Sequence, residues 1–325
     1  MALTQKPTDL VEAACQKVAA RSPELQRILG ETSSQSASSI RGESSGFLGA
    51  VWNDRITLAN GASAKLSPLI EIFDVALIQV CDLAVFGHAQ RSNRSPIIWP
   101  EAKFPRRPSR NAVFYVLAAN LAQTIQAVRL LIVQGFENQA RSALRNFVEL
   151  ADLTLAVLAD EGVYGAYIET FVDEKATYTH WSKRLRPSII QKLVLDLERA
   201  DPISTSTDAT PEQIRREFYG WLSQFTHNNF AAHVVAAHPV DADGNHGALA
   251  MLGEVGEMSR ATLAHGLMYL WVTLTRLQRL LWRDHGWGGF RGGRTRKWFE
   301  YRFLVFDGMC ASYLPTFWDE GQARP

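Results

Sequence analysis

Apolar residues between Ser67 and residue 284 recur mostly with the three- and four-residue spacing of α-helices. Ser67 can cap a helix, and Pro68 suits a first helical position. Further on, Thr210 and Gln213 form a capping box that starts a later helix. The pattern predicts helices over 68–87, 111–134, 136–160, 163–185, 188–200, from 210 through the stretch 221–233, and over 255–284.

The period changes after this stretch. Residues 233–252 alternate or run apolar around DADGN, which predicts a β-hairpin with a tight turn. Potential metal ligands flank that turn: His233, His238, His246, Asp241 and Asp243. Their spacing matches no standard zinc pattern, and Leu252 stands where a calcium loop needs glutamate. We interpret DADGN as a plain turn and predict an all-α, multi-helix bundle with a small β-hairpin insertion near 233–252.

The first 66 residues differ from this bundle. Apolar positions spaced for one helix face predict an N-terminal amphipathic helix in segment 1–30: Leu10, Val11, Ala14, Val18, Leu25 and Leu29. The stretch 32–46 then holds seven serines in fifteen residues, and such a segment buries too little apolar surface to offset its ordering entropy. We predict a Ser-rich linker and irregular segment over 31–66, a bundle domain over 67–285 and a basic aromatic tail over 286–325.

The net charge of the chain indicates no particular class of partner. The chain of 325 residues carries 34 Lys+Arg against 33 Asp+Glu, a formal net charge of +1, so only a local patch would favour nucleic acid or a membrane surface. The longest apolar run, 113–133, is interrupted by polar residues that are costly in lipid: Asn120, Gln123, Gln126 and Arg129. This run is typical of a buried core helix, and we predict no membrane partner.

Three isolated cysteines, Cys15, Cys81 and Cys310, fit a reducing compartment, and the N-terminus lacks the continuous apolar core of a signal peptide. We therefore expect a cytoplasmic protein. The sequence contains no GxGxxG after a strand, no GxxxxGK[ST], no HExxH and no GxSxG. These absences disfavour P-loop, zinc-protease and α/β-hydrolase chemistry, and we predict no cofactor and no metal site.

The segment 136–160 is apolar around most of its circumference, which predicts a central helix. Its polar residues share one narrow stripe: Asn138, Arg141, Arg145, Glu149 and Asp152. Arg145 and Glu149 are four residues apart and can form an ion pair. Two interpretations remain open: a structural pair that fixes the register of the helices, or the lining of a functional cleft.

The stretch WLSQFTHNNFAAH, 221–233, adds a second polar row. Tyr219, Ser223 and His227 follow one another at four-residue spacing, so two hydroxyls and an imidazole line one helix face. If this row faces the Arg145–Glu149 pair, an Arg/Glu/Ser/His cluster forms inside the bundle. Histidine is suited to proton transfer near neutral pH, and such a cluster is equally a set of mutually satisfied polar groups.

Arg260 and His265 stand in the sequence RATLAH, which resembles the R-x4-6-H motif of HEPN-superfamily ribonucleases, themselves compact helical bundles. The resemblance implies metal-independent attack on an RNA phosphodiester by this arginine and histidine, usually across a homodimer interface. The polar residue that often follows the arginine in that family is Ala261 here. A regular helix places the two side chains about 140° apart, so they converge only where the helix is irregular.

A broader resemblance covers roughly residues 68–283. The order Gly135, Ala140, Arg145, Glu149 on one helix, followed by Tyr219, Ser223, His227 on a later one, is similar to a group of bacterial helical domains of unknown function. This resemblance implies a shared fold and a polar centre, but no activity. Relatives of both groups occur in defence or abortive-infection settings, which makes RNA or a nucleotide an expected ligand class.

The C-terminal tail interleaves cations with aromatic rings in RGGRTRKWFEYRF, which suits phosphate and base contacts and equally suits a terminal helix that covers the bundle. Exposed tryptophans, expected at Trp271, Trp282 and Trp287, would favour a homodimer, although tryptophan is as often a core residue as an interface residue.

The sequence leaves two hypotheses for the function. The first is an interaction or sensing protein of a bacterial defence or stress system, with a protein partner. The alternative is a HEPN-like ribonuclease that uses His227 or the Arg260–His265 pair.

Overall fold

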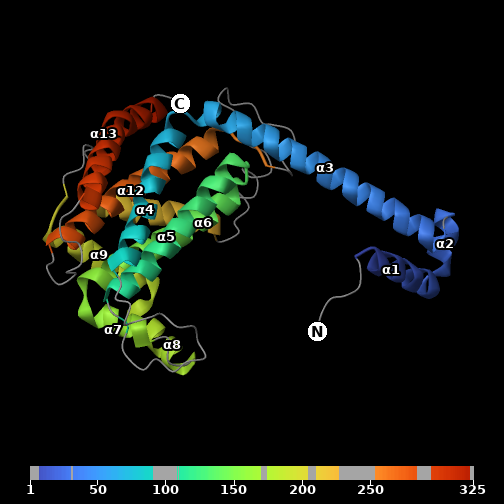
Figure 1. Cartoon of the computed structure of the whole chain (residues 1–325), viewed down its shortest axis with the longest axis horizontal. Coiled ribbons are helices and arrows are strands. Elements are labelled where there is room, and N and C mark those ends of the chain that lie inside the picture. The colour runs from blue at the N-terminus through green and yellow to red at the C-terminus, as the bar shows by residue number, and fades with distance from the viewer. Residues whose placement is uncertain are drawn as a thin grey trace. The chain divides into compact units, whose positions relative to one another are not determined.

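The computed structural model describes residues 7–30, 32–90, 108, 110–169, 174–203, 210–226, 253–283 and 294–322. Every secondary-structure element in these ranges is helical, so the all-α prediction is confirmed (Figure 1). The hairpin predicted near 233–252 lies outside the described residues, and no strand occurs within them. The chain divides into two compact units, residues 1–60 and 61–325.

The N-terminal amphipathic segment is two helices rather than one. Helix α1 spans Pro7–Arg21 and α2 spans Pro23–Leu29. A proline inside a helix removes a backbone hydrogen bond and clashes with the preceding turn, so the chain breaks at Ser22 and Pro23 begins the next helix. The prediction of a single helix was therefore wrong at this proline.

The Ser-rich linker predicted over 31–66 is instead an α-helix, α3, which spans Ser33–Leu66. A capping box starts it: the Thr32 amide donates to Gln35 Oε1 at 2.8 Å, and the Gln35 amide donates to Thr32 Oγ1 at 3.3 Å. No proline interrupts the segment, and serine costs a helix only about 0.5 kcal/mol per residue relative to alanine. Composition suggested disorder, but the local capping pattern favours a helix.

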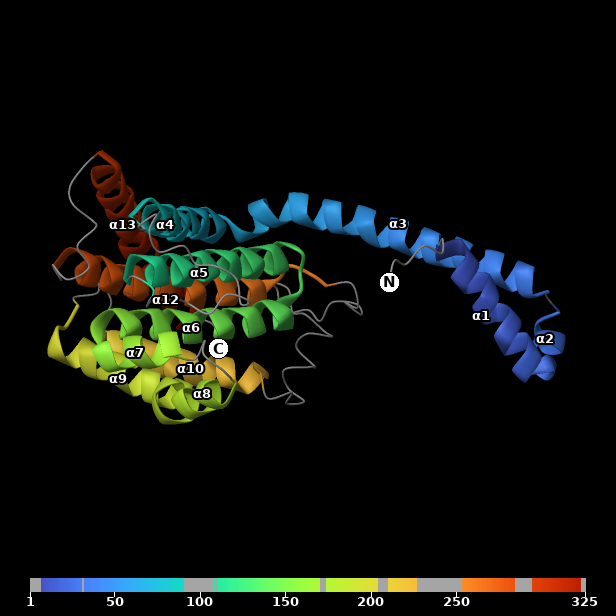
Figure 2. The same ribbon diagram turned by 60° about the horizontal axis from the view of Figure 1, so that its bottom comes forward.

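The unit from Gly61 onward is built around four long helices. They are α4 (Leu69–Gln90), α5 (Arg110–Val133), α6 (Glu137–Ala159) and α12 (Glu257–Arg283). Helix α6 contacts α5 and α12 on one side, and α9 (Pro187–Ala200) and α10 (Pro211–Thr226) on the other (Figure 2). The prediction of a central helix over 136–160 is confirmed, because α6 is surrounded by neighbours.

Gly135 ends α5, as its position predicted. Its φ is +73°, a conformation that L-residues with a side chain rarely adopt, and Gly253 opposite it has φ +85°. The Glu254 amide donates to the Gly135 carbonyl at 3.2 Å. A Cβ at Gly135 would lie 2.4 Å from the Glu254 nitrogen, so the close approach of these two backbones requires glycine.

Helix α5 is long and apolar enough to cross a membrane, the only such helix among the described residues. Eleven of its residues are buried, and it packs between α4 and α6. Asp74 of α4 also accepts a hydrogen bond from Arg129 Nη2 at 2.8 Å. These contacts are those of a bundle core helix, as the sequence predicted.

The region between α6 and α10 is more broken than the sequence indicated. In place of one helix over 163–185 stand α7 (Glu161–Glu169), α8 (Glu174–His180) and a single π-helical turn, η1 (Trp181–Leu185), that continues α8. The capping box before α10 is confirmed: Thr210 and Gln213 exchange backbone-to-side-chain hydrogen bonds of 2.8 and 3.2 Å.

The C-terminal tail contains a long helix, α13, which spans Arg294–Gln322 and packs against α4 and α12 (Figure 1). Its inward face is buried: Phe299, Phe303, Phe306, Cys310 and Leu314. Trp271 of α12 is 4% exposed and donates its indole N–H to Asp307 at 2.6 Å. The expectation of an exposed Trp271 was wrong; Trp287 and the Trp282 side chain lie outside the description.

Candidate functional site

Four of the five residues of the predicted polar stripe, Arg141, Arg145, Glu149 and Asp152, bond to neighbouring helices in three groups along α6, and Asn138 is half-buried beside the first group. The first contains Glu137 and Arg141, the second Arg145 and Glu149, and the third Asp152. Each group finds its partners on α10 or α12. The face is therefore the contact between these helices.

In the first group, Arg141 Nε donates to Glu137 Oε1 at 3.0 Å and to Thr262 Oγ1 at 3.1 Å. The Thr262 hydroxyl also donates to Glu137. Arg141 is fully buried, and its guanidinium lies 4.9 Å from the centre of the Trp221 ring. Burial lowers the pKa of the Arg141 guanidinium, and the facing Glu137 carboxylate opposes this.

The second group contains the predicted Arg145–Glu149 pair, joined by Tyr219 from the polar row of 219–227. Arg145 Nε donates to Glu149 Oε1 at 3.1 Å, and the Tyr219 hydroxyl lies 3.3 Å from both Arg145 Nη2 and Glu149 Oε1. The side chains are half-buried, at 20% exposure for Arg145 and 31% for Glu149. Burial, together with the Glu149 charge, raises the pKa of the Tyr219 phenol.

Ser223 and His227 complete that prediction only in part. The Ser223 hydroxyl donates to the backbone carbonyl of Tyr219 at 2.8 Å, the bond typical of a serine one turn along a helix. His227 lies outside the described residues. The structure thus brings together Arg145, Glu149 and Tyr219, with Ser223 one turn away.

The third group is a buried charge network that the sequence did not reveal. Asp152 of α6 accepts from Arg215 Nη1 of α10 at 2.8 Å and from the Tyr269 hydroxyl of α12. The network continues through Glu198 of α9, which accepts from Arg215 Nε at 3.1 Å and from Arg276 of α12. Its members, Asp152, Glu198, Arg215, Tyr269 and Arg276, are each at most 4% exposed.

The two acids and two arginines of this network balance in charge. Burial alone would lower the pKa of the Arg215 guanidinium, but Tyr269 and the carboxylates of Asp152 and Glu198 raise it above its ordinary value. Burial raises the pKa of Asp152, and Arg215 and Tyr269 oppose that rise. Removing one partner would leave an uncompensated buried charge, which is far more costly than losing a surface pair.

At its outer end the network reaches the surface through Asp201, directly after α9. Arg276 Nη1 and Arg279 Nη1 donate to the two oxygens of this carboxylate at 2.9 and 3.1 Å. The available sequence signal was Arg276 itself, because it stands at a core spacing in the apolar run VTLTRLQRLL.

Arg260 and His265, the residues that match the HEPN motif, do not come together in the structure. Both residues lie inside the regular helix α12, which begins at Glu257. Arg260 contacts the carbonyl of Lys65 at 3.3 Å and Glu257 at 3.9 Å. The His265 ring instead stacks on Trp221, with centroids 4.4 Å apart and 9° between the planes. The two side chains therefore have separate neighbours on different elements.

His265 is held as a neutral ring. Its Nδ1 lies 2.7 Å from the Ala261 carbonyl, which places a proton on that nitrogen. Burial and the nearby Arg141 cation lower its pKa to about 4, against the opposing effect of the Ala261 carbonyl. At neutral pH this imidazole is an uncharged member of an aromatic stack.

This pKa predicts a pH dependence of stability. The ordinary histidine value is 6.5, so between about pH 6.5 and 4 the unfolded chain binds a proton that folded His265 does not. The free energy of unfolding should therefore fall as the pH is lowered through this window. Thermal melts of the wild type and of His265→Phe should show a shallower fall in the variant, which stacks but cannot titrate. Equal slopes would contradict the assigned state of His265.

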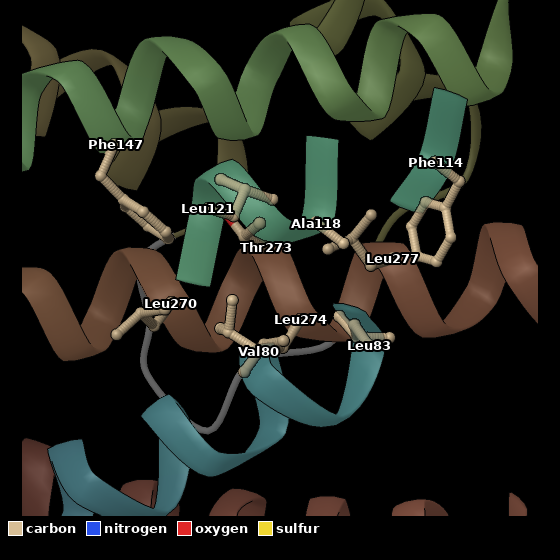
Figure 3. Close-up of a pocket in the computed structure, with 10 residues that line it drawn as sticks. All are labelled: Val80, Leu83, Phe114, Ala118, Leu121, Phe147, Leu270, Thr273, Leu274 and Leu277. Atoms are coloured by element: carbon tan, nitrogen blue, oxygen red, sulfur yellow. The ribbon is translucent and has the colours of Figure 1, made fainter. Parts of the chain in front are cut away.

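The cavity shown in Figure 3 offers no polar site. It lies between α4, α5, α6 and α12, measures about 10 Å³ and is lined by Val80, Leu83, Phe114, Ala118, Leu121, Phe147, Leu270, Thr273, Leu274 and Leu277. This is room for about one water molecule, and an apolar cavity of this kind stays dry. It is a packing gap in the core.

No group of three metal-ligating side chains occurs within the described ranges, and the histidines around DADGN lie outside them. The cysteines are unbridged thiols. Comparisons of the chain with protein-family models, with curated proteins and with solved structures find no match.

Proposed function

We propose that this chain is a non-catalytic helical interaction or sensing protein, working in a bacterial defence or stress system. The observation that carries the proposal is the buried charge network. Its acids and arginines neutralise one another across four helices, with Arg215 and Arg276 each 1% exposed. Acids and arginines that are buried and paired with one another hold helices in register. Among the described residues, Arg215 Nη2 and Arg276 Nε have no hydrogen-bond partner, and the network reaches the surface at Asp201.

The ribonuclease alternative receives less support from the geometry. Metal-independent cleavage of RNA needs an acid–base histidine and an arginine together in an open groove. His265 is stacked against Trp221 with its Nδ1 on a backbone carbonyl, and Arg260 has other neighbours. Within the described part of the chain, the Arg145–Glu149–Tyr219 group is half-buried and partly open to solvent, and it would suit a small polar ligand.

The test is RNA cleavage in chelator by the purified wild type, His227→Ala and His265→Ala. We expect no cleavage above buffer in any of the three, because the proposal assigns neither histidine an acid–base role. His265→Ala should lower the melting temperature through loss of the Trp221 stack. Cleavage that disappears in one folded variant would overturn the proposal and identify the catalytic histidine.

A further inference from the structure

A basic, aromatic surface lies away from the α6 face, on α8 and η1. Between Lys175 and Lys192 the chain carries five Lys and Arg residues and no Asp or Glu, although the whole protein is close to neutral. We define the α8–η1 patch by its exposed side chains: Lys175, Tyr178, Trp181, Lys183, Arg184 and Arg186. Such a local concentration of positive charge attracts an anionic partner.

The cations of this patch contact neighbouring groups without forming ion pairs. Within the described ranges Lys175, Lys183, Arg184 and Arg186 make no ion pair, whereas the nearby Arg199 is bonded to Glu212 at 2.9 Å. Arg184 packs over Gly162 of α7, where a Cβ would lie 2.5 Å from Nη1. The patch therefore presents cations outside any ion pair among the described residues, although Asp160 Oδ1 lies on the same side of Gly162 as Arg184, and Glu169 pairs with His180 at 3.1 Å.

Two aromatic rings stand among these cations. Tyr178 is 69% exposed and Trp181 is 47% exposed, with ring centroids 6.4 Å apart and an angle of 32° between the planes. The Arg186 guanidinium lies 5.9 Å from the centre of the Trp181 ring. Trp181 opens the π-helical turn, a feature often found at functional sites. The two exposed rings place flat apolar surface directly beside the cations.

The chemistry favours a nucleic-acid strand over a membrane. A helix that lies in a membrane surface presents a broad aliphatic face. Here the aliphatic residues that follow the patch turn toward the bundle, and Ile190 is 2% exposed. The residues between Tyr178 and Lys183 other than Trp181 are polar: Thr179, His180 and Ser182. Cations interleaved with flat rings match the phosphates and bases of a single strand.

We propose that the α8–η1 patch binds single-stranded nucleic acid, with Tyr178 and Trp181 stacking on bases and Lys183, Arg184 and Arg186 contacting phosphates. This proposal deepens the interaction role proposed above by naming the partner class. It requires no cleavage, so binding and cleavage assays fail independently of each other.

The test is fluorescence anisotropy of a labelled 20-nucleotide oligouridylate, titrated with the full chain at several salt concentrations. The first variant is Trp181→Ala, and its matched control is Trp298→Ala on α13. Trp298 is 49% exposed, and like Trp181 it has an arginine beside its ring: the Arg302 guanidinium lies 5.6 Å from the ring centre. Loss of base stacking should weaken binding at least about fivefold in Trp181→Ala and leave the control unchanged.

A second variant removes charge: Lys183→Ala/Arg184→Ala/Arg186→Ala. Three lost phosphate contacts should reduce the slope of log affinity against log salt by roughly 2. A 20-base-pair duplex of the same length should bind more weakly than the oligouridylate, because its bases are not free to stack. Phosphatidylserine vesicles serve as the membrane comparison.

The proposal is overturned if the oligouridylate does not bind, or if Trp181→Ala and the triple variant bind it as the wild type does. Equal losses in Trp181→Ala and Trp298→Ala would also overturn it, as would preferential binding to the duplex or to the vesicles. Cleavage of the oligouridylate in chelator would instead overturn the non-catalytic function and leave this binding site standing.

Discussion

Replacing Arg215 by methionine should destabilise the protein by about 3–5 kcal/mol. The substitution leaves Asp152 and Glu198 buried without the guanidinium that bonds to both of them, at 2.8 and 3.1 Å. It also removes the hydrogen bond from Arg215 to the Tyr269 hydroxyl, at 2.9 Å. In a unit of this size the melting temperature should fall by roughly 10 °C, measured by thermal unfolding followed by circular dichroism.

The adjacent arginine is the matched control. Arg216 has a side chain that is 64% exposed and pairs with Glu212 at 2.7 Å, on the same helix as Arg215. Exposed pairs contribute at most about 1 kcal/mol, so Arg216→Ala should leave the melting temperature within a few degrees of the wild type. Similar losses in the two variants would mean that burial of the network does not govern stability.

Replacing Gly135 by alanine should cost at least about 2 kcal/mol. The positive φ of +73° strains any residue with a Cβ, and here the added atom would also press against the Glu254 backbone, 2.4 Å away. Because backbone cannot rotate aside as a side chain can, the α5–α6 turn must separate from residues 253–254. Thermal unfolding should show the loss as a melting temperature lower by roughly 5 °C.

Gly220 gives the opposite expectation. It lies in α10, and a Cβ there meets no heavy atom within 4 Å. Alanine is a better helix former than glycine, so Gly220→Ala should raise stability by up to about 1 kcal/mol. If Gly135→Ala were as stable as Gly220→Ala, the close approach of Gly135 and Glu254 would not be a constraint on the fold.

The helices of the larger unit were predictable because helical periodicity is local. The end of α5 at Gly135 and the capping box of Thr210 and Gln213 before α10 can each be recognised from residues that are close in the sequence. The same pattern stands at Thr32 and Gln35, but the prediction for 31–66 rested on serine content, which is a weak guide because serine only mildly disfavours a helix. Local capping chemistry, more than composition, explains where α3 begins.

The candidate site was predictable only along single helices. The Arg145–Glu149 pair follows from four-residue spacing, and Tyr219 belongs to the polar row whose position opposite that pair the sequence left open. The buried network was missed because its members lie on four different helices. Arg276 stands at a core spacing, but its partners are known only when the register between the helices is known. The α8–η1 patch was missed for a related reason, since exposure and the π-helical turn at Trp181 are properties of the folded chain.

The most direct test of a structural role for the network is the coupling free energy between Asp152 and Arg215. A double-mutant cycle with Asp152→Asn, Arg215→Met and the double variant isolates this term from the separate losses. Our account predicts that each single variant is strongly destabilised and that the double variant recovers about 1–3 kcal/mol relative to additivity. Losses that add to within about 0.5 kcal/mol would contradict it, because the two charges would then not depend on each other.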